Sequence, residues 1–159
     1  MGTGKSDVGR RLAKELKMHF IDTDTLVEKA EGRSITSIFK ENGEEHFRDL
    51  ETKILDTLSD YDNFVISTGG GMVLRQENVD KLKKIGPLVL LGAKTEVIAK
   101  RLKGVKGRPL LDVPDPEKRI VEILEVRNPI YERIADYKVD TSEADLSEAA
   151  QKIIDYLKR

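Results

Sequence analysis

The segment that most constrains this chain is Gly2-Thr3-Gly4-Lys5-Ser6, which is followed at once by residues with the apolar spacing of a helix. It matches the second half of the phosphate-binding pattern G-x-x-x-x-G-K-[ST]. In such a loop, backbone N–H groups surround phosphate oxygens, the lysine reaches the β- and γ-phosphates, and the serine hydroxyl binds Mg²⁺. The positive end of the helix dipole adds to this attraction. The segment therefore predicts a nucleotide-binding loop, with a flexible glycine-rich helix cap as the alternative.

The composition supports one globular domain over residues 1–159, since 159 residues is an ordinary single-domain size. A net charge of -1 creates no field that favours nucleic acid or an anionic membrane. The absence of cysteine excludes disulfides and thiolate zinc sites. No apolar run is long enough to cross a membrane, and no signal peptide is visible. We therefore expect a cytoplasmic monomer with no nucleic-acid or membrane partner.

Short apolar segments predict four strands, and amphipathic segments between them predict helices. The strands are expected at 19–21, 64–66, 88–91 and 137–140. The helices are expected at 5–17, after Leu26, around 35–39, and at 44–59, 76–84, 95–103, 117–135 and 146–157. This alternation predicts an α/β fold in which helices cover both faces of a parallel sheet. A phosphate-loop fold also needs a fifth strand, which would precede Met1.

Two carboxylates, Asp22 and Asp24, follow the first predicted strand. Open α/β sheets bind ligands beyond the carboxyl ends of their strands. One carboxylate could reach Mg²⁺ through water, while the other accepts a proton from a substrate hydroxyl. The alternative is structural: Thr23 or Asp24 caps the helix that begins at Leu26. Beside a nucleotide-binding loop we favour the functional interpretation.

Arg48 and Glu51 lie three positions apart on a predicted helix, so their side chains can touch. Spacing alone favours a solvated surface pair. The alternative is an arginine that holds a substrate carboxylate by two hydrogen bonds and is steadied by Glu51.

Three successive glycines, Gly69-Gly70-Gly71, follow the second predicted strand. Each of them costs conformational entropy on folding. We therefore favour a ligand that lies directly on the backbone, over a tight turn that requires a positive φ.

The segment 94–108 is locally basic, and Gly104 and Gly107 are possible hinges within it. Together with the prolines that follow, they predict a mobile loop over 104–116. Such a loop could close over phosphates and supply a cation to the developing charge. A solvated charged surface is the alternative for most of its lysines. Arg108, between a glycine and a proline, is the cation we single out.

Arg127 lies within an apolar helix face, where arginine is rarely found without a partner. The partner could be an anionic ligand or a neighbouring acid, Glu125 or Glu132. His19 and His46 are isolated from each other in the sequence, and we expect both to be structural.

Taken together, these segments resemble the shikimate kinase family of small P-loop kinases. The resemblance covers nearly the whole chain. It depends on six segments in order: G-T-G-K-S (2–6), D-T-D (22–24), F-R-D-L-E (47–51), S-T-G-G-G (67–71), R-P-L-L (108–111) and R-N-P-I-Y (127–131). It implies a three-layer P-loop kinase fold with substrate-binding helices at about 33–59 and a mobile lid at about 104–116.

The resemblance implies phosphoryl transfer from ATP to the 3-hydroxyl of shikimate, which gives shikimate 3-phosphate on the route to chorismate and the aromatic amino acids. It implies Mg²⁺ as cofactor, held by Ser6 and, through water, by Asp22. The implied catalytic residues are Lys5, Asp24 (the base) and Arg108 (the lid arginine). The implied shikimate ligands are Asp24, Arg48, Gly70 and Arg127, with the two arginines on the carboxylate. The implied ATP ligands are Gly2, Thr3, Gly4, Lys5, Ser6, Asp7, Arg101 and Arg108.

Two departures from the family pattern stand out. The family begins with a strand that is central in its sheet, whereas this chain begins inside the loop, so we expect a truncated or mis-started chain with two neighbouring strands left unpaired. Asp7 stands where the family usually has threonine, and its carboxylate would weaken nucleotide binding or, facing the helix dipole, be harmless. The alternatives are a related small-molecule kinase, such as one acting on gluconate, and a truncated non-catalytic nucleotide-binding protein.

Overall fold

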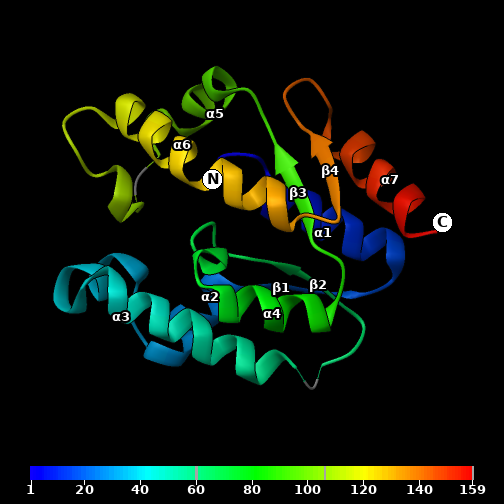
Figure 1. Ribbon diagram of the computed structural model, residues 1–159, viewed down its shortest axis with the longest axis horizontal. Coiled ribbons are helices and arrows are strands. Elements are labelled where there is room, and N and C mark those ends of the chain that lie inside the picture. The colour runs from blue at the N-terminus through cyan, green and yellow to red at the C-terminus, as the bar shows by residue number, and fades with distance from the viewer. Residues whose placement is uncertain (60, 106, 159) are drawn as a thin grey trace.

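The computed structural model of the chain describes residues 1–59, 61–105 and 107–158. Helices and strands alternate along these residues (Figure 1). The strands are β1 (His19–Asp22), β2 (Phe64–Ser67), β3 (Val89–Gly92) and β4 (Tyr137–Asp140). The α-helices are α1 (Lys5–Leu16), α2 (Thr23–Glu31), α3 (Ile35–Leu58), α4 (Gln76–Ile85), α5 (Thr95–Leu102), α6 (Pro116–Ile134) and α7 (Leu146–Leu157). Two short 3-10 helices are η1 (Met72–Leu74) and η2 (Pro109–Leu111). None of the helices described is both long enough and apolar enough to cross a membrane.

The described strands form two parallel pairs. β1 lies beside β2 with His19 opposite Phe64, and β3 lies beside β4 with Val89 opposite Tyr137. Parallel pairing confirms the α/β class that the alternation of elements predicted. Within the described residues no strand joins β2 to β3, and both line an apolar groove of about 530 Å³. The expectation that two neighbouring strands are unpaired holds on one side of each strand only, because β2 pairs with β1 and β3 pairs with β4.

Helix α1 connects the two strand pairs. Its residues Val8 and Leu12 are buried in one cluster with Leu91 of β3, Val139 of β4 and Ile153 of α7. The spacing of four between Val8 and Leu12 places them on one face of the helix. The same helix also packs against β1 and β2. Figure 1 shows α3 and α4 beside the β1–β2 pair, and α6 and α7 beside the β3–β4 pair.

Helix α2 begins earlier than the sequence analysis predicted. It starts at Thr23, and its N-cap is Asp22, whose Oδ1 accepts a hydrogen bond from the backbone N–H of Asp24 at 3.1 Å. The interpretation in which Thr23 or Asp24 caps a helix starting at Leu26 is therefore wrong. An aspartate at the end of a strand suits this position because its backbone is extended and its negative charge interacts favourably with the positive end of the helix dipole.

Helix α3 joins two helices that were predicted separately. The segments 35–39 and 44–59 are continuous in α3 apart from a break at Gly43, where φ is 83° and ψ is 173°. Glycine adopts this left-handed φ without strain. Ser34 is the N-cap of α3, and its Oγ accepts a hydrogen bond from the N–H of Ser37 at 3.2 Å.

Within the predicted loop at 104–116, the described residues 104–105 and 107–115 form no helix or strand apart from η2, and Pro116 is the first residue of α6. Its proposed hinges, Gly104 and Gly107, both have a left-handed φ, of 75° and 77°. Lys106, which contributes to the basic character of this segment, lies outside the described residues.

The burial of Leu55 on α3 predicts a large loss of stability when its side chain is truncated. Leu55 is 1% exposed and packs with residues of η1 and α4. Leu55→Ala should lower the free energy of unfolding by about 2–5 kcal/mol because a cavity replaces the side chain. Leu157→Ala is the matched control, since Leu157 is 43% exposed, and should cost less than about 1 kcal/mol. Urea denaturation measures both, and equal losses would contradict the packing described.

Candidate active site

The phosphate-binding loop forms the amino-terminal end of α1. Gly2 and Gly4 have left-handed φ values of 69° and 80°, which glycine adopts readily. Gly4 is the N-cap of α1, and it has no side chain to bond the first N–H groups of the helix. The loop lines a pocket of about 550 Å³. An open helix N-terminus of this kind attracts anions through its N–H groups and its dipole.

Ser6 and Asp22 meet beside this loop. The hydroxyl of Ser6 donates a hydrogen bond to Asp22 Oδ2 at 2.7 Å. Ser6 lies in the first turn of α1, and Asp22 lies at the carboxyl end of β1. The fold thus brings together a hydroxyl and a carboxylate, which are the oxygen donors that Mg²⁺ prefers.

Cationic groups converge next to the loop. Burial lowers the pKa of Lys5, and the nearby Arg108 lowers it further, whereas Asp24 and Asp22 oppose the shift. The site therefore concentrates positive charge where a phosphate would lie.

Asp24 lies in the first turn of α2, with its carboxyl group facing these cations. Burial raises the pKa of Asp24, and the charge of Asp22 adds to this, while Lys5, Arg108 and Arg48 oppose it. A buried carboxylate with a raised pKa is a stronger proton acceptor than an exposed one. Its surroundings suit a general base.

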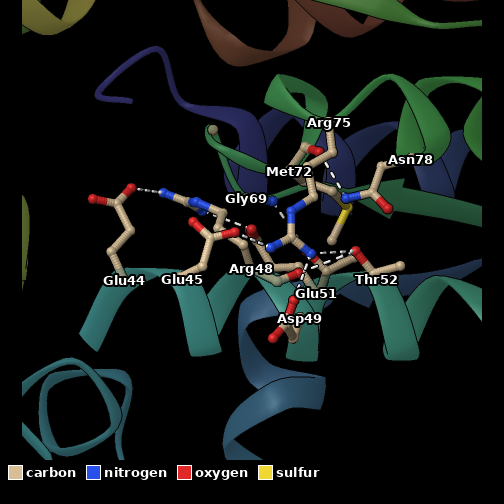
Figure 2. Close-up of polar contacts among 12 residues, drawn as sticks. Glu44, Glu45, Arg48, Asp49, Glu51, Thr52, Gly69, Met72, Arg75 and Asn78 are labelled. Carbon is tan, nitrogen blue, oxygen red and sulfur yellow. Dashed lines mark hydrogen bonds and ion pairs between the residues drawn. The ribbon is translucent and has the colours of Figure 1, made fainter. Parts of the chain in front are cut away.

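Arg48 and Glu51 form a buried ion pair on α3 (Figure 2). Arg48 is 6% exposed and Glu51 is 0% exposed. Arg48 Nη1 donates to Glu51 Oε2 at 2.6 Å, and Arg48 Nη2 donates to Glu44 Oε1 at 2.6 Å. Glu51 Oε1 has no hydrogen-bond partner in the described part of the chain. The interpretation of Arg48 and Glu51 as a solvated surface pair is therefore wrong.

The glycines at 69–71 allow side chains to approach the backbone closely. A Cβ at Gly71 would lie 2.3 Å from the guanidinium of Arg48, and one at Gly69 would lie 2.5 Å from Glu51 Oε1 and 2.7 Å from Asp24 Oδ1. None of the three glycines has a positive φ. The turn that requires positive φ is therefore excluded. At two of the three positions the close neighbour is a protein side chain rather than the ligand that the sequence suggested.

Helix α6 brings Arg127 to the same turn. Arg127 is 8% exposed, and its Nη1 lies 3.6 Å from the position of a Cβ on Gly70. In the residues that the structure describes, no ion pair joins Arg127 to Glu125 or Glu132, the acidic partners considered from sequence. Arg127 and Arg48 therefore reach the glycine turn from two different helices.

The remaining predicted ATP ligands lie around the phosphate pocket. Arg108, at the start of η2, lines it. Arg101 also lines it, and its Nη2 donates to the carbonyl oxygen of Thr141 at 2.6 Å. Asp7 is exposed on α1 and pairs with Arg10 at 3.6 Å. Asp7 thus has a cationic partner on its own helix and lies at the positive end of the helix dipole.

Sequence reasoning missed three residues that hold this site together. The Thr23 hydroxyl accepts from Gly69 N–H at 3.0 Å, the Tyr131 hydroxyl donates to Gly70 O at 2.6 Å, and Thr141 Oγ1 donates to Thr3 O at 3.1 Å. Thr23 lies in the segment chosen for Asp22 and Asp24, and Tyr131 lies in the segment chosen for Arg127. No pattern in the sequence pointed to Thr141, because its partner lies 138 positions away.

A glycine-rich loop that precedes a helix, with lysine and serine at its end and parallel strands beside it, defines a P-loop nucleotide-binding protein. The family model described as Shikimate kinase matches residues 1–158. The chain belongs to the shikimate kinase family.

Curated relatives support this assignment. The chain is 49% identical to the shikimate kinase of Caldanaerobacter subterraneus subsp. tengcongensis, over 97% of this chain and 90% of the relative. It is 47% identical to the shikimate kinase of Pelotomaculum thermopropionicum, over 99% of this chain and 91% of the relative.

Solved structures agree on the fold. The shikimate kinase from Acinetobacter baumannii in complex with shikimate superposes with a TM-score of 0.95 at 37% identity, covering 99% of this chain and 88% of that chain. The shikimate kinase from Aquifex aeolicus superposes with a TM-score of 0.85 at 40% identity, covering 99% of this chain and 92% of that chain. The three-layer P-loop kinase fold is thus confirmed, and neither the gluconate-type kinase nor the non-catalytic alternative is favoured.

The close packing of Arg48 on the glycine turn predicts that a methyl group at position 71 is harmful. Gly71→Ala should displace the Arg48 guanidinium, and should lower kcat/KM for the substrate by about ten- to a hundredfold, since small misplacements of binding groups are costly. Gly92→Ala is the control, because nothing lies within 4 Å of a Cβ at Gly92. Steady-state kinetics of both variants test this, and normal activity in Gly71→Ala would show that Arg48 is free to move.

Proposed function

We propose that this chain transfers the γ-phosphoryl group of ATP to the 3-hydroxyl of shikimate, giving shikimate 3-phosphate for chorismate and aromatic amino acid biosynthesis. The observation that carries the proposal is the convergence of buried Arg48 and Arg127 on one glycine turn, beside Asp24 and the phosphate-binding loop. Family membership and the shikimate complex of the structural relative support the same substrate.

Arg48 and Arg127 would bind the carboxylate of shikimate. Both guanidinium groups are shielded from water, so a carboxylate placed between them would form strong charge-assisted hydrogen bonds. Glu51 neutralises part of the charge of Arg48 and holds it in place. Gly70, which lies between the two arginines, would present its backbone to the substrate.

Asp24 would accept the proton of the attacking hydroxyl. Its raised pKa and its position among Lys5, Arg108 and Asp22 support this assignment. Lys5 would bind the β- and γ-phosphates, and Arg108, from the lid at about 104–116, would stabilise charge on the transferred group. Phosphoryl transfer needs little beyond this positioning and electrostatic stabilisation.

The donor set at Ser6 and Asp22 fits Mg²⁺. Ser6 would bind the ion directly and Asp22 through water, since their side chains already lie 2.7 Å apart. When bound, the ion neutralises charge on the β- and γ-phosphates. The rest of the nucleotide would contact Gly2, Thr3, Gly4 and Asp7 in the loop, with Arg101 near the adenine.

We also propose the domain organisation that goes with this activity. The single domain, 1–159, would use the helices at about 33–59 to bind substrate and the loop at about 104–116 as a lid. We expect a cytoplasmic monomer whose partners are ATP and shikimate, without nucleic acid or membrane.

ADP release from Mg·ATP tests the reaction directly. We expect release that depends on shikimate, is absent with gluconate or without acceptor, and stops when EDTA removes Mg²⁺. Lys5→Ala should reduce turnover by at least about a hundredfold, because it removes the cation on the transferring phosphates. Release at the same rate with and without shikimate would refute the proposed function. Near-normal turnover of Lys5→Ala would refute the assignment of the loop.

The carboxylate clamp predicts a substrate-specific defect. Arg127→Ala should raise KM for shikimate by about ten- to a hundredfold, since it removes charge-assisted hydrogen bonds, and should change KM for ATP far less. Arg119→Ala is a matched control on the same helix, because Arg119 is exposed and pairs with Glu122. Equal increases in both Michaelis constants for Arg127→Ala would argue against the clamp.

A further inference from the structure

The hydroxyl of Tyr131 makes a contact that the mechanism above does not use. It donates a hydrogen bond to the carbonyl oxygen of Gly70 at 2.6 Å, across 61 positions of sequence. Tyr131 lies on α6 one turn after Arg127, so the two side chains leave the helix on the same face. This contact therefore ties the helix that carries Arg127 to the glycine turn.

The carbonyl oxygen of Gly70 differs from those of Gly69 and Gly71 in its hydrogen-bond donor, which is a side chain. The carbonyl oxygens of Gly69 and Gly71 accept hydrogen bonds from backbone N–H groups of the same turn, at 3.2 and 3.1 Å. Among the residues described, only Tyr131 donates to the carbonyl oxygen of Gly70. The orientation of the peptide plane between Gly70 and Gly71 is therefore held by the phenol.

Both arginines lie against this peptide. The guanidinium of Arg48 would be 2.3 Å from a Cβ on Gly71. A Cβ on Gly70 would lie 3.3 Å from the Tyr131 hydroxyl and 3.6 Å from Arg127 Nη1. A rotation of the peptide plane would therefore disturb the packing surface of Arg48 and the surroundings of Arg127 together.

The surroundings of the Tyr131 phenol favour a fixed hydrogen-bond donor to the carbonyl oxygen of Gly70. Its ring packs against the apolar cluster that contains Met72 and Val73, which limits its movement. Burial raises the pKa of Tyr131, although the charge of Arg127 opposes the shift. The hydroxyl therefore keeps its proton and remains a donor at neutral pH.

We propose that Tyr131 is a positioning residue of the carboxylate clamp: by fixing the peptide between Gly70 and Gly71, it sets the separation and orientation of Arg48 and Arg127. The inference rests on the proposed function, in which these two arginines bind the carboxylate of shikimate. It assigns Tyr131 to substrate recognition and gives it no part in nucleotide binding or proton transfer.

Tyr131→Phe is the direct test, because it removes the donor and keeps the ring. KM for shikimate should rise about five- to tenfold, the effect of one lost hydrogen bond, while kcat and KM for ATP stay within about twofold. Tyr137→Phe is the matched control, since Tyr137 stacks on Tyr156 on another element, and it should leave all three constants unchanged. An unchanged KM for shikimate in Tyr131→Phe would overturn the inference.

A double variant separates positioning from general destabilisation. If Tyr131 acts through the clamp, Tyr131→Phe should raise KM for shikimate much less in an Arg127→Ala background than in the unmodified chain. The full five- to tenfold increase in that background, or a matching rise in KM for ATP with a lowered Tm, would overturn the inference.

Failure of the proposed function and failure of the role of Tyr131 give different results. An unmodified chain whose ADP release does not depend on shikimate would overturn the proposed function and this inference together. Shikimate-dependent release with a normal KM in Tyr131→Phe would overturn the inference alone.

Discussion

The buried ion pair between Arg48 and Glu51 is the interaction on which the geometry of the site depends. Two charges removed from water are stable only together, and loss of one partner from such a pair costs about 3–5 kcal/mol. The pair is 2.6 Å long and lies against the backbone of the turn at Gly69 and Gly71. Because side chains at those positions would collide with the pair, α3 and the turn after β2 constrain each other. The same arrangement leaves the guanidinium of Arg48 facing the place where a carboxylate would bind.

Parallel pairing of β1 with β2 explains why Asp24 lies beside the glycine turn at 69–71. Asp22 at the end of β1 is the register partner of Ser67 at the end of β2. The residues that follow them, Asp24 and the glycine turn, are therefore neighbours although more than forty positions separate them. Burial raises the pKa of Asp24 and lowers that of Lys5, and the charge of each residue opposes the shift of the other. A buried carboxylate and the lysine of the glycine-rich loop are thus held at the same edge of the sheet.

Helix α1 connects this edge to the rest of the molecule. Its amino-terminal end forms the phosphate-binding loop, while Val8 and Leu12 bury its opposite face against β3, β4 and α7. The two strand pairs do not share a hydrogen-bonded edge in the described residues, and an apolar groove of about 530 Å³ lies between them. Packing on α1 therefore provides much of the connection between the two strand pairs.

The sequence by itself determined the α/β class, the positions of the strands within a residue or two, and the residues of the phosphate loop, because these depend on local periodicity and on a motif with a fixed mechanism. It did not determine whether Arg48 and Glu51 were buried, because spacing on a helix does not say which face is covered. It also misplaced the start of α2, where Asp22 competed with two other capping residues. Only the tertiary structure decided the surroundings of the glycine turn and the contact of Tyr131 with Gly70, since both join segments far apart in the chain and depend on how the helices pack.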